Sequence, residues 1–288
     1  MKIAFLELLL MTAGIGFAQE QFSVSGSIDW DKREITVTSS LNLESASIRL
    51  PTGRVRAEES LRASLVQAVR PFILEVPVDS ANKVGDLVTR GDMSLQQVDE
   101  LARGVKQIPA SLSPDLTEIR ARYIVNLNEI SSALIRHTSA ADIPHSLTPT
   151  PATAYTGIII IANDPLPIHG RHESTLAVPS LFPKIWDTSM NLIFERNLMD
   201  PQIARNEPIV HYVSANRIFQ STPSGMDAEL LARVGPRPFR ILAREIFGIY
   251  PTDIVIDPAD ALLLVSSEEN RKLLREGRIT FVLNDEVL

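Results

Sequence analysis

The sequence predicts an α+β protein, with two small mixed units that contain mainly antiparallel sheets and follow a cleaved signal peptide. Residues 21–42 alternate apolar and polar side chains around a turn at 29–32, which is typical of a β-hairpin. Two later segments, 56–69 and 95–107, carry apolar residues at helical spacing. The isoleucine run at 158–161 suits a strand that is buried on both faces.

Composition restricts the class of protein. The 288 residues are 44% apolar and 22% charged, as in a folded globular protein with one large or two ordinary domains. The net charge of −7 argues against binding to nucleic acid, which needs a basic surface. The absence of cysteine excludes disulfides, thiolate metal sites and a lipidated cysteine anchor.

The N-terminus has the layout of a signal peptide. A short basic start is followed by an apolar stretch at 3–17, and Gly16 and Ala18 form the small-x-small pattern of a cleavage site. We expect cleavage after Ala18, a mature chain that begins at Gln19, and a periplasmic location. An N-terminal core helix is the alternative. A transmembrane anchor is disfavoured because Glu7 interrupts an already short apolar run.

The predicted N-terminal unit covers residues 19–136. After the hairpin, a helix at 56–69 should stop or kink at Pro71. A second helix at 95–107 begins with a capping-box pattern of Ser94 and Gln97. Alternation of apolar residues from 119 onward predicts one long strand over 119–135.

A Pro/Ser/Thr-rich segment, 137–154, is expected to link the units, or else to pack along a sheet edge and join them into one body. The C-terminal unit then covers residues 155–288. Its predicted strands are 158–161, 182–190, 191–196, 209–213, 239–250, 253–256 and 279–283. Two helices should follow the strand at 253–256: one capped by Asp257, and one that begins near Ser267 and ends at Gly277.

One loop could bind a metal. His169 and His172 lie three residues apart, with Asp164 and Glu173 nearby, so a zinc site or a metal-dependent enzyme is conceivable. However, Gly170 and nearby prolines disfavour a helix that would hold both rings on one face. We therefore expect solvated loop residues here.

The remaining polar clusters have structural interpretations. Asp253, Asp257 and Asp260 could form a carboxylate cluster, but a strand end, a helix cap and a first helical turn explain all three. The arginines at 237, 240 and 244 form a local basic patch that suits the solvated face of a strand. Ser189 and the Ser224-Gly225 pair lack a nucleophile-elbow motif, and the chain has no phosphate-binding glycine loop. The sequence thus predicts no catalytic, cofactor-binding or metal-binding residue and no cofactor.

Residues 155–285 resemble a bacterial envelope family, the periplasmic LPP-type lipoproteins that include the flagellar basal-disc protein FlgP. Four motifs in order carry the resemblance: Tyr-Thr-Gly before the apolar strand at 155–162, Pro-Lys-Ile-Trp-Asp at 183–187, the strand-to-helix join at 253–260, and the closing strand at 277–284. The lipidated cysteine of that family is missing. The start of the helix after 50–54 more loosely resembles uncharacterised bacterial periplasmic proteins.

The resemblance implies a non-catalytic structural or assembly protein of the cell envelope, in association with the flagellar motor. Its partners would be other copies of itself or other envelope proteins. The strands at 158–161 and 279–283 are the predicted sites of pairing between subunits. The alternatives are a metal-dependent enzyme that uses His169 and His172, and a periplasmic module that binds a small ligand.

Overall fold

A computed structural model describes residues 22–143, 153–219 and 228–288. The predicted signal peptide lies outside these residues. The chain divides into two compact units, Met1–Glu75 with Val84–Glu129, and Val76–Lys83 with Ile130–Leu288. Within the predicted N-terminal stretch 19–136, the segments 76–83 and 130–136 group with the second unit.

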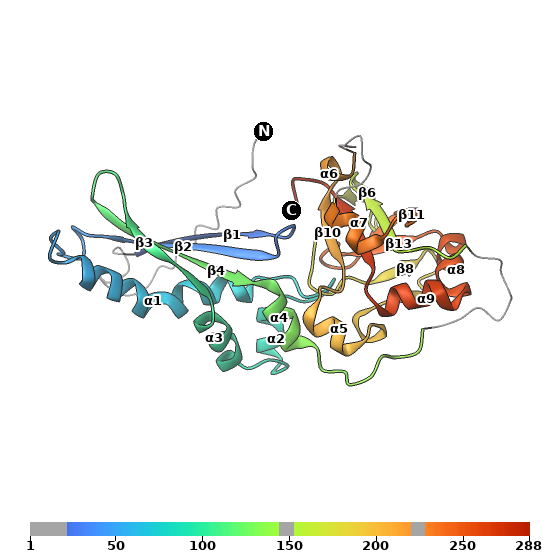
Figure 1. Ribbon diagram of the computed structural model, residues 1–288, viewed down its shortest axis with the longest axis horizontal. Helices are drawn as coiled ribbons and strands as arrows, with labels where there is room; N and C mark the ends of the chain where they lie inside the picture. The colour runs from blue at the N-terminus through green and yellow to red at the C-terminus, as the bar shows by residue number, and fades with distance from the viewer. Residues whose placement is uncertain (1–21, 144–152, 220–227) are drawn as a thin grey trace. The chain divides into compact units, whose positions relative to one another are not determined.

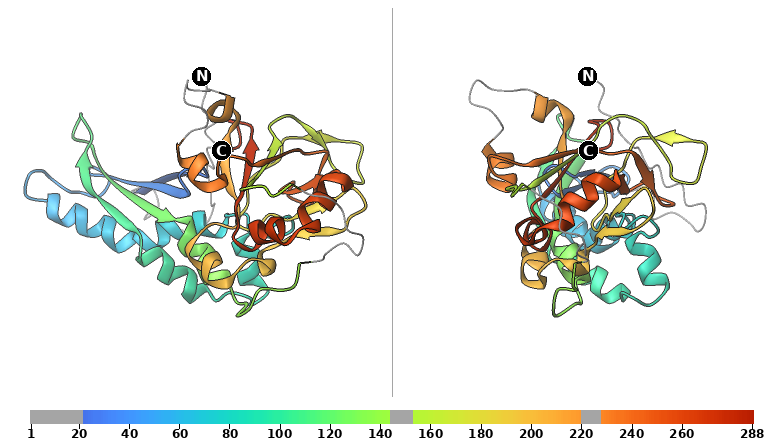
Figure 2. Two further views of the ribbon diagram at one scale, coloured as in Figure 1. Left: turned by 45° about the vertical axis from the view of Figure 1, so that its right-hand side comes forward. Right: turned by 90° about the vertical axis from the view of Figure 1, so that its right-hand side faces the viewer.

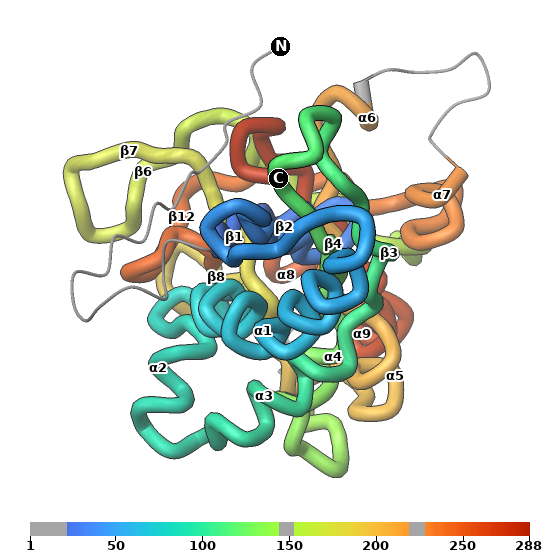
Figure 3. Tube along the Cα trace, turned by 90° about the vertical axis from the view of Figure 1, so that its left-hand side faces the viewer, coloured from blue at the N-terminus to red at the C-terminus, as the bar shows by residue number. Residues whose placement is uncertain are grey.

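The first unit is an antiparallel sheet covered on one face by a long helix (Figures 1 and 3). The sheet has the order β1-β2-β4-β3, and the helix is α1, Arg54–Leu74. The strands are β1 Phe22–Asp29, β2 Glu34–Asn42, β3 Lys106–Leu112 and β4 Glu118–Asn126. The core lies between sheet and helix, where Tyr123 of β4 is 2% exposed and donates a 3.1 Å hydrogen bond to the carbonyl of Leu61. The predicted hairpin is confirmed by the β1–β2 pairing.

The helices of this unit confirm one predicted cap and differ from two predicted helix ends. Helix α1 continues through Pro71 to Leu74, so the predicted stop at this proline is wrong. Helix α2 is Val84–Thr89, and α3, Leu95–Arg103, has the predicted capping box of Ser94 and Gln97. It ends earlier than predicted, because Gly104 caps it and β3 follows at once.

The predicted strand 119–135 is wrong in its second half. Strand β4 ends at Asn126, and α4, Leu127–Leu134, follows directly. Leu127, Ile130 and Leu134 are buried at helical spacing, so their burial requires a helix. The side chain of Asn126 supports this switch, because its Oδ1 accepts a 2.8 Å hydrogen bond from the backbone N–H of Asn128.

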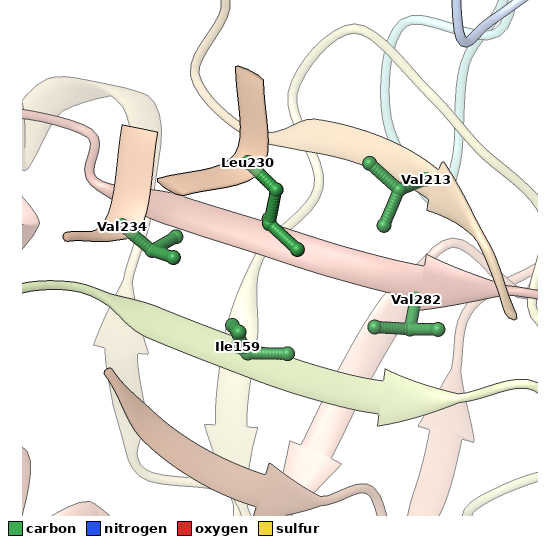
Figure 4. Close-up of a cluster of buried hydrophobic side chains, with 5 residues drawn as sticks. All are labelled: Ile159, Val213, Leu230, Val234 and Val282. Atoms are coloured by element: carbon green, nitrogen blue, oxygen red, sulfur yellow. The ribbon is translucent and has the colours of Figure 1, made fainter. Parts of the chain in front are cut away.

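The larger sheet of the second unit is parallel, in contrast to the antiparallel sheet of the first. Its order is β10-β14-β5-β11, with β5 Ile158–Ala162, β10 His211–Ser214, β11 Phe239–Leu242 and β14 Ile279–Leu283. Helix α6, Ala215–Phe219, follows β10 directly, and helix α7, Ala228–Val234, precedes β11. Five buried side chains from α7 and the sheet form one cluster (Figure 4): Ile159, Val213, Leu230, Val234 and Val282.

A second, mixed sheet has the order β12-β13-β8-β9, from Glu245–Phe247, Asp253–Ile256, Ile185–Asp187 and Leu192–Phe194. The single strand predicted at 239–250 is wrong, because β11 and β12 belong to different sheets. The chain crosses between the sheets at Ala243, whose N–H bonds to Ile161, and at Arg244, whose N–H bonds to Val255. Strands β6 Leu166–Pro167 and β7 Ser174–Thr175 form a separate small hairpin.

Of the remaining helices, α8 and α9 begin at the predicted caps, whereas α5 and a short 3-10 helix were not predicted. Helix α5 is Pro201–Asn206, after the short 3-10 helix η2, Arg196–Leu198. Helix α8, Pro258–Ser266, is capped by Asp257, and α9, Glu268–Arg275, is capped by Ser267. Figure 2 shows this helix pair in red, and the two helices contact each other.

Two segments from outside the predicted C-terminal unit pack within the second unit. Residues 76–83 follow α1, yet the carbonyls of Pro77 and Val78 accept hydrogen bonds of 3.0 and 2.8 Å from the N–H groups of Leu181 and Phe182. In the segment predicted as a linker, the N–H of Ala141 donates a 2.7 Å bond to Asn197. The described part of that segment is therefore packed against the second unit.

Candidate functional site

The loop with the two histidines holds one carboxylate–imidazole pair. His169 lies in the turn between β6 and β7, and its Nδ1 is 2.5 Å from Oε2 of Glu245 on β12. The backbone N–H of His169 donates a 2.8 Å hydrogen bond to the carbonyl of Ile246, which fixes the turn against β12. The ring also meets Phe247 edge-on, with 6.3 Å between the ring centroids. Because a carboxylate on Nδ1 orients an imidazole, Glu245 positions His169.

The other predicted members of this site do not join the pair. His172, Glu173 and Asp164 are exposed, and Gly170 adopts a left-handed conformation with φ of 75° that turns the chain between the two histidines. Among the described residues, no group of three or more His, Cys, Asp and Glu side chains is placed to hold a metal ion. The loop therefore offers one oriented imidazole, without the converging ligands that a metal site needs.

Asp253 is the most enclosed acidic group of the predicted carboxylate cluster. It is fully buried at the start of β13 and accepts hydrogen bonds from the Ser80 hydroxyl at 2.9 Å, the Trp186 indole N–H at 3.0 Å and the Lys184 N–H at 3.1 Å. Burial raises the pKa of Asp253, and the three hydrogen bonds oppose that rise. The Ser80 bond joins the segment 76–83 to the mixed sheet, and the bonds from Lys184 and Trp186 join β13 to β8, so Asp253 has a structural role.

The other two carboxylates of that cluster lie at the start of α8. Asp257 is the N-cap and accepts a 2.9 Å hydrogen bond from the N–H of Ala259. Asp260 lies in the first turn, where burial and the charge of Asp257 raise its pKa. The cap interpretation of both residues is confirmed.

The basic patch is exposed, as the sequence predicts. Arg237, Arg240 and Arg244 all have exposed side chains, and Arg244 lies 3.4 Å from Asp257 in an exposed ion pair. Ser189 lies in the turn after β8, where its N–H donates to Asp187. The Ser224-Gly225 pair lies outside the described residues.

The strands that were predicted to pair between subunits are internal. Strand β14 has β10 and β5 as neighbours, and β5 has β14 and β11. Both edges of each strand are thus hydrogen-bonded within the unit, and neither strand can accept another chain without losing a neighbour. The prediction of strand addition at 158–161 and 279–283 is therefore wrong.

An open edge lies instead on β1 in the first unit. In the described part of the chain, β1 has one hydrogen-bonded neighbour, β2, over eight residue pairs without a bulge. It contains no proline and no basic residue, and its one charge is Asp29 at the end. A long, regular, neutral edge is a template for another strand.

The opposite edge of the same sheet is protected. Strand β3 carries Lys106 and Pro109, and its pairing with β4 is interrupted by an irregularity between Ile108 and Ser111. A charge, a proline and a bulge are the devices by which proteins block strand addition. The contrast between the two edges singles out β1 as the candidate interaction site.

Several structurally important polar residues gave no clear signal in the sequence. Asn270 is fully buried, and its side chain bonds to Tyr155, Thr153 and Leu263. Arg233 donates hydrogen bonds to the carbonyls of Pro208 and Gly277, and desolvation lowers its pKa to about 10. These contacts join residues far apart in sequence, so no local motif reveals them.

These features define a two-unit α+β protein, in which an antiparallel sheet with a long helix precedes a unit built on a parallel sheet. Residues 21–133 match the family described as Treponema pallidum Tp0624, N-terminal domain, and residues 157–285 match Treponema pallidum Tp0624, second domain. The matches cover most of the chain, which therefore belongs to this two-domain family. A search of curated proteins found no match.

Neither domain match is to the LPP-type lipoproteins, so that resemblance stays a prediction from the sequence. Within the described ranges, none of the helices has the length and apolar character needed to cross a bilayer.

Proposed function

We propose that this chain is a non-catalytic periplasmic protein with a structural or assembly role in the bacterial cell envelope. The open edge of β1 is the observation that carries the proposal. In the part of the chain that the structure describes, these eight residues of regular strand have a neighbouring strand on one side alone, while the opposite edge of the sheet is blocked. Strand addition at such an edge joins proteins through main-chain hydrogen bonds and needs no cofactor or catalytic residue.

The leader-like start of the sequence supports a periplasmic location. Association with the flagellar motor rests on the resemblance of residues 155–285 to the LPP-type family and forms the more specific part of the proposal. In that setting the second unit would provide a rigid body, since its parallel strands are buried, and the first unit would provide the edge.

The enzyme alternative rests on the pair of His169 and Glu245. Both side chains are about one-third exposed, at 31% and 33%, and the described residues add no third ligand. An oriented imidazole can act as a general base, but nucleophilic or metal-assisted chemistry needs a further converging group. The assembly role is therefore the better supported of the two.

The test compares two lysine substitutions in cells. Ser25→Lys places a charge on the exposed side of β1, and Ser111→Lys places the same charge on the already protected β3. Chemical cross-linking in intact cells should give high-mass species for the wild type and for Ser111→Lys, and lose them for Ser25→Lys. Equal cross-linking of all three proteins, or recovery of the protein in the cytoplasm with Met1 intact, would contradict the proposal.

A further inference from the structure

We infer that the partner at the β1 edge is β1 of a second copy, paired antiparallel about a two-fold axis that passes through Ser25. The inference rests on the proposed assembly role and names its partner. A two-fold axis makes the interface self-complementary, because both copies contribute the same strand. The dimer then has no free β1 edge, so the assembly does not grow into a filament.

The sequence of β1 is a palindrome in polarity. Phe22, Ser23 and Val24 precede Ser25, and Gly26, Ser27 and Ile28 follow it. Residues at equal distances from Ser25 therefore match in polarity. An antiparallel pair centred on Ser25 therefore sets Phe22 opposite Ile28, Ser23 opposite Ser27, and Val24 opposite Gly26. Residues directly opposite in an antiparallel pair share a face, so serine meets serine and apolar meets apolar along the whole strand.

On one face of the sheet, the proposed pairing would extend the rows of serine and threonine side chains that β1 and β2 already form. Strand β2 sets Ser40, Thr38 and Thr36 opposite Ser23, Ser25 and Ser27 of β1. The Oγ atoms of Ser23 and Ser40 are 2.6 Å apart, at hydrogen-bond distance. A second copy would add the same residue type on the other side of β1, where cross-strand serine pairs form further hydrogen bonds.

The other face would cover an exposed apolar side chain. Val24 is 40% exposed, and the pairing sets it opposite Gly26 of the second copy. The ring of Phe72 from α1 lies over Gly26, so closely that a Cβ there would be only 2.6 Å from Cε1. Val24 of one copy would thus pack beside the Phe72 ring that covers Gly26 of the second copy, and this contact would bury the exposed valine.

The charges also favour this arrangement. Asp29 is the one charged residue of β1. In the antiparallel register the two copies of Asp29 lie at opposite ends of the strand pair, eight residues apart or about 27 Å. A parallel pairing would place the two carboxylates side by side, where like charges repel.

Disulfide trapping tests the register, and a chain without cysteine suits it well. Ser25→Cys would place two thiols directly opposite, with about 5 Å between their Cα atoms, within the range that a disulfide spans. Ser23→Cys and Ser27→Cys are matched controls, because each residue would lie about 13 Å from its own copy. Under a mild oxidant such as diamide, Ser25→Cys should form a covalent dimer at least tenfold faster than either control.

The combined variant Ser23→Cys/Ser27→Cys should also form dimers, because each cysteine then faces the other type in the second copy. Faster dimerisation of either single control, or no dimer from any variant with a wild-type melting curve, would overturn the inference. If the cysteine variants form no dimer while Ser25→Lys still abolishes cross-linking in cells, a different protein occupies the edge. Self-pairing then fails and the assembly role survives.

Discussion

The hydroxyl of Ser80 donates a 2.9 Å hydrogen bond to Oδ2 of Asp253, a residue 173 positions further along the chain. Trp186 donates to the same oxygen at 3.0 Å, and burial raises the pKa of this carboxyl group. A loop that follows α1 is in this way fixed to the mixed sheet of the second unit. Asp253 is therefore a structural anchor, and its substitution should affect stability.

Asp253→Asn should lower the free energy of unfolding by about 1–3 kcal/mol at neutral pH. Asparagine has one oxygen acceptor, so the half-buried indole N–H of Trp186 or the N–H of Lys184 would lose its partner. Denaturant titration of the wild type and the variant measures the loss. Asp164→Asn, at an exposed position, is the control and should stay within about 0.5 kcal/mol. Equal stability of Asp253→Asn and wild type would show that the anchor is not needed.

The pH dependence of the same comparison has a definite sign. Because burial raises the folded-state pKa of Asp253 above 3.8, the folded chain binds this proton more tightly than the unfolded chain. The carboxyl group therefore contributes most to stability below its unfolded pKa, and the contribution declines as the pH rises through the folded pKa. The stability gap between wild type and Asp253→Asn should widen on acidification from about pH 7 toward about pH 4. A gap that narrows would contradict the raised pKa.

Asp257→Ala should cost about 1 kcal/mol, because α8 loses the side chain that accepts the N–H of Ala259. Asp257→Asn keeps an acceptor oxygen at the cap and should recover most of that loss. The midpoints of urea unfolding give both values. If alanine and asparagine are equally destabilising, the loss comes from the ion pair with Arg244 and not from the cap.

The core of the parallel sheet should be sensitive at Ile159, which is 1% exposed and belongs to the cluster in Figure 4. Ile159→Ala should cost about 2–5 kcal/mol through the cavity that it leaves. Ile161 is only partly buried, so Ile161→Ala should cost less. Ile249→Ala, at a 69% exposed position, serves as the control. If Ile161→Ala lowers the free energy of unfolding more than Ile159→Ala does, Ile159 is not the more deeply packed of the two residues.

The histidine loop should tolerate alanine. His172→Ala should change stability by less than about 0.5 kcal/mol, and His169→Ala by no more than about 1 kcal/mol, since its partner Glu245 is partly exposed. Thermal melts and elemental analysis of the purified protein check both statements. One bound metal per chain, or loss of the cellular phenotype in variants that fold normally, would favour the enzyme alternative.

Local patterns predicted the elements whose formation depends on nearby residues. The β1–β2 hairpin, the capping box of Ser94 and Gln97, and the cap at Asp257 all form as predicted. Each depends on side chains within a few positions of one another, so a short window of sequence contains the needed information.

The failures involve contacts over long distances in sequence. Leu127 continues the alternation of β4, but packing requires a helix from that residue onward. The run at 158–161 was correctly predicted as a buried strand, yet its neighbours β14 and β11 come from residues more than 75 positions away. Which strand lies at an edge depends on such pairings, and so the alternation of β1 could be recognised in the sequence while its open edge could not.

Sedimentation velocity with charge-swapped variants tests most directly whether β1 pairs with itself. Ser25→Lys and Ser25→Glu each place like charges opposite one another at the two-fold axis, which destabilises the pair. The wild type should sediment as a dimer, each variant alone as a monomer, and an equimolar mixture of the two variants as a dimer again. A wild-type protein that stays monomeric at every concentration, or a mixture that sediments like its separate components, would contradict the account.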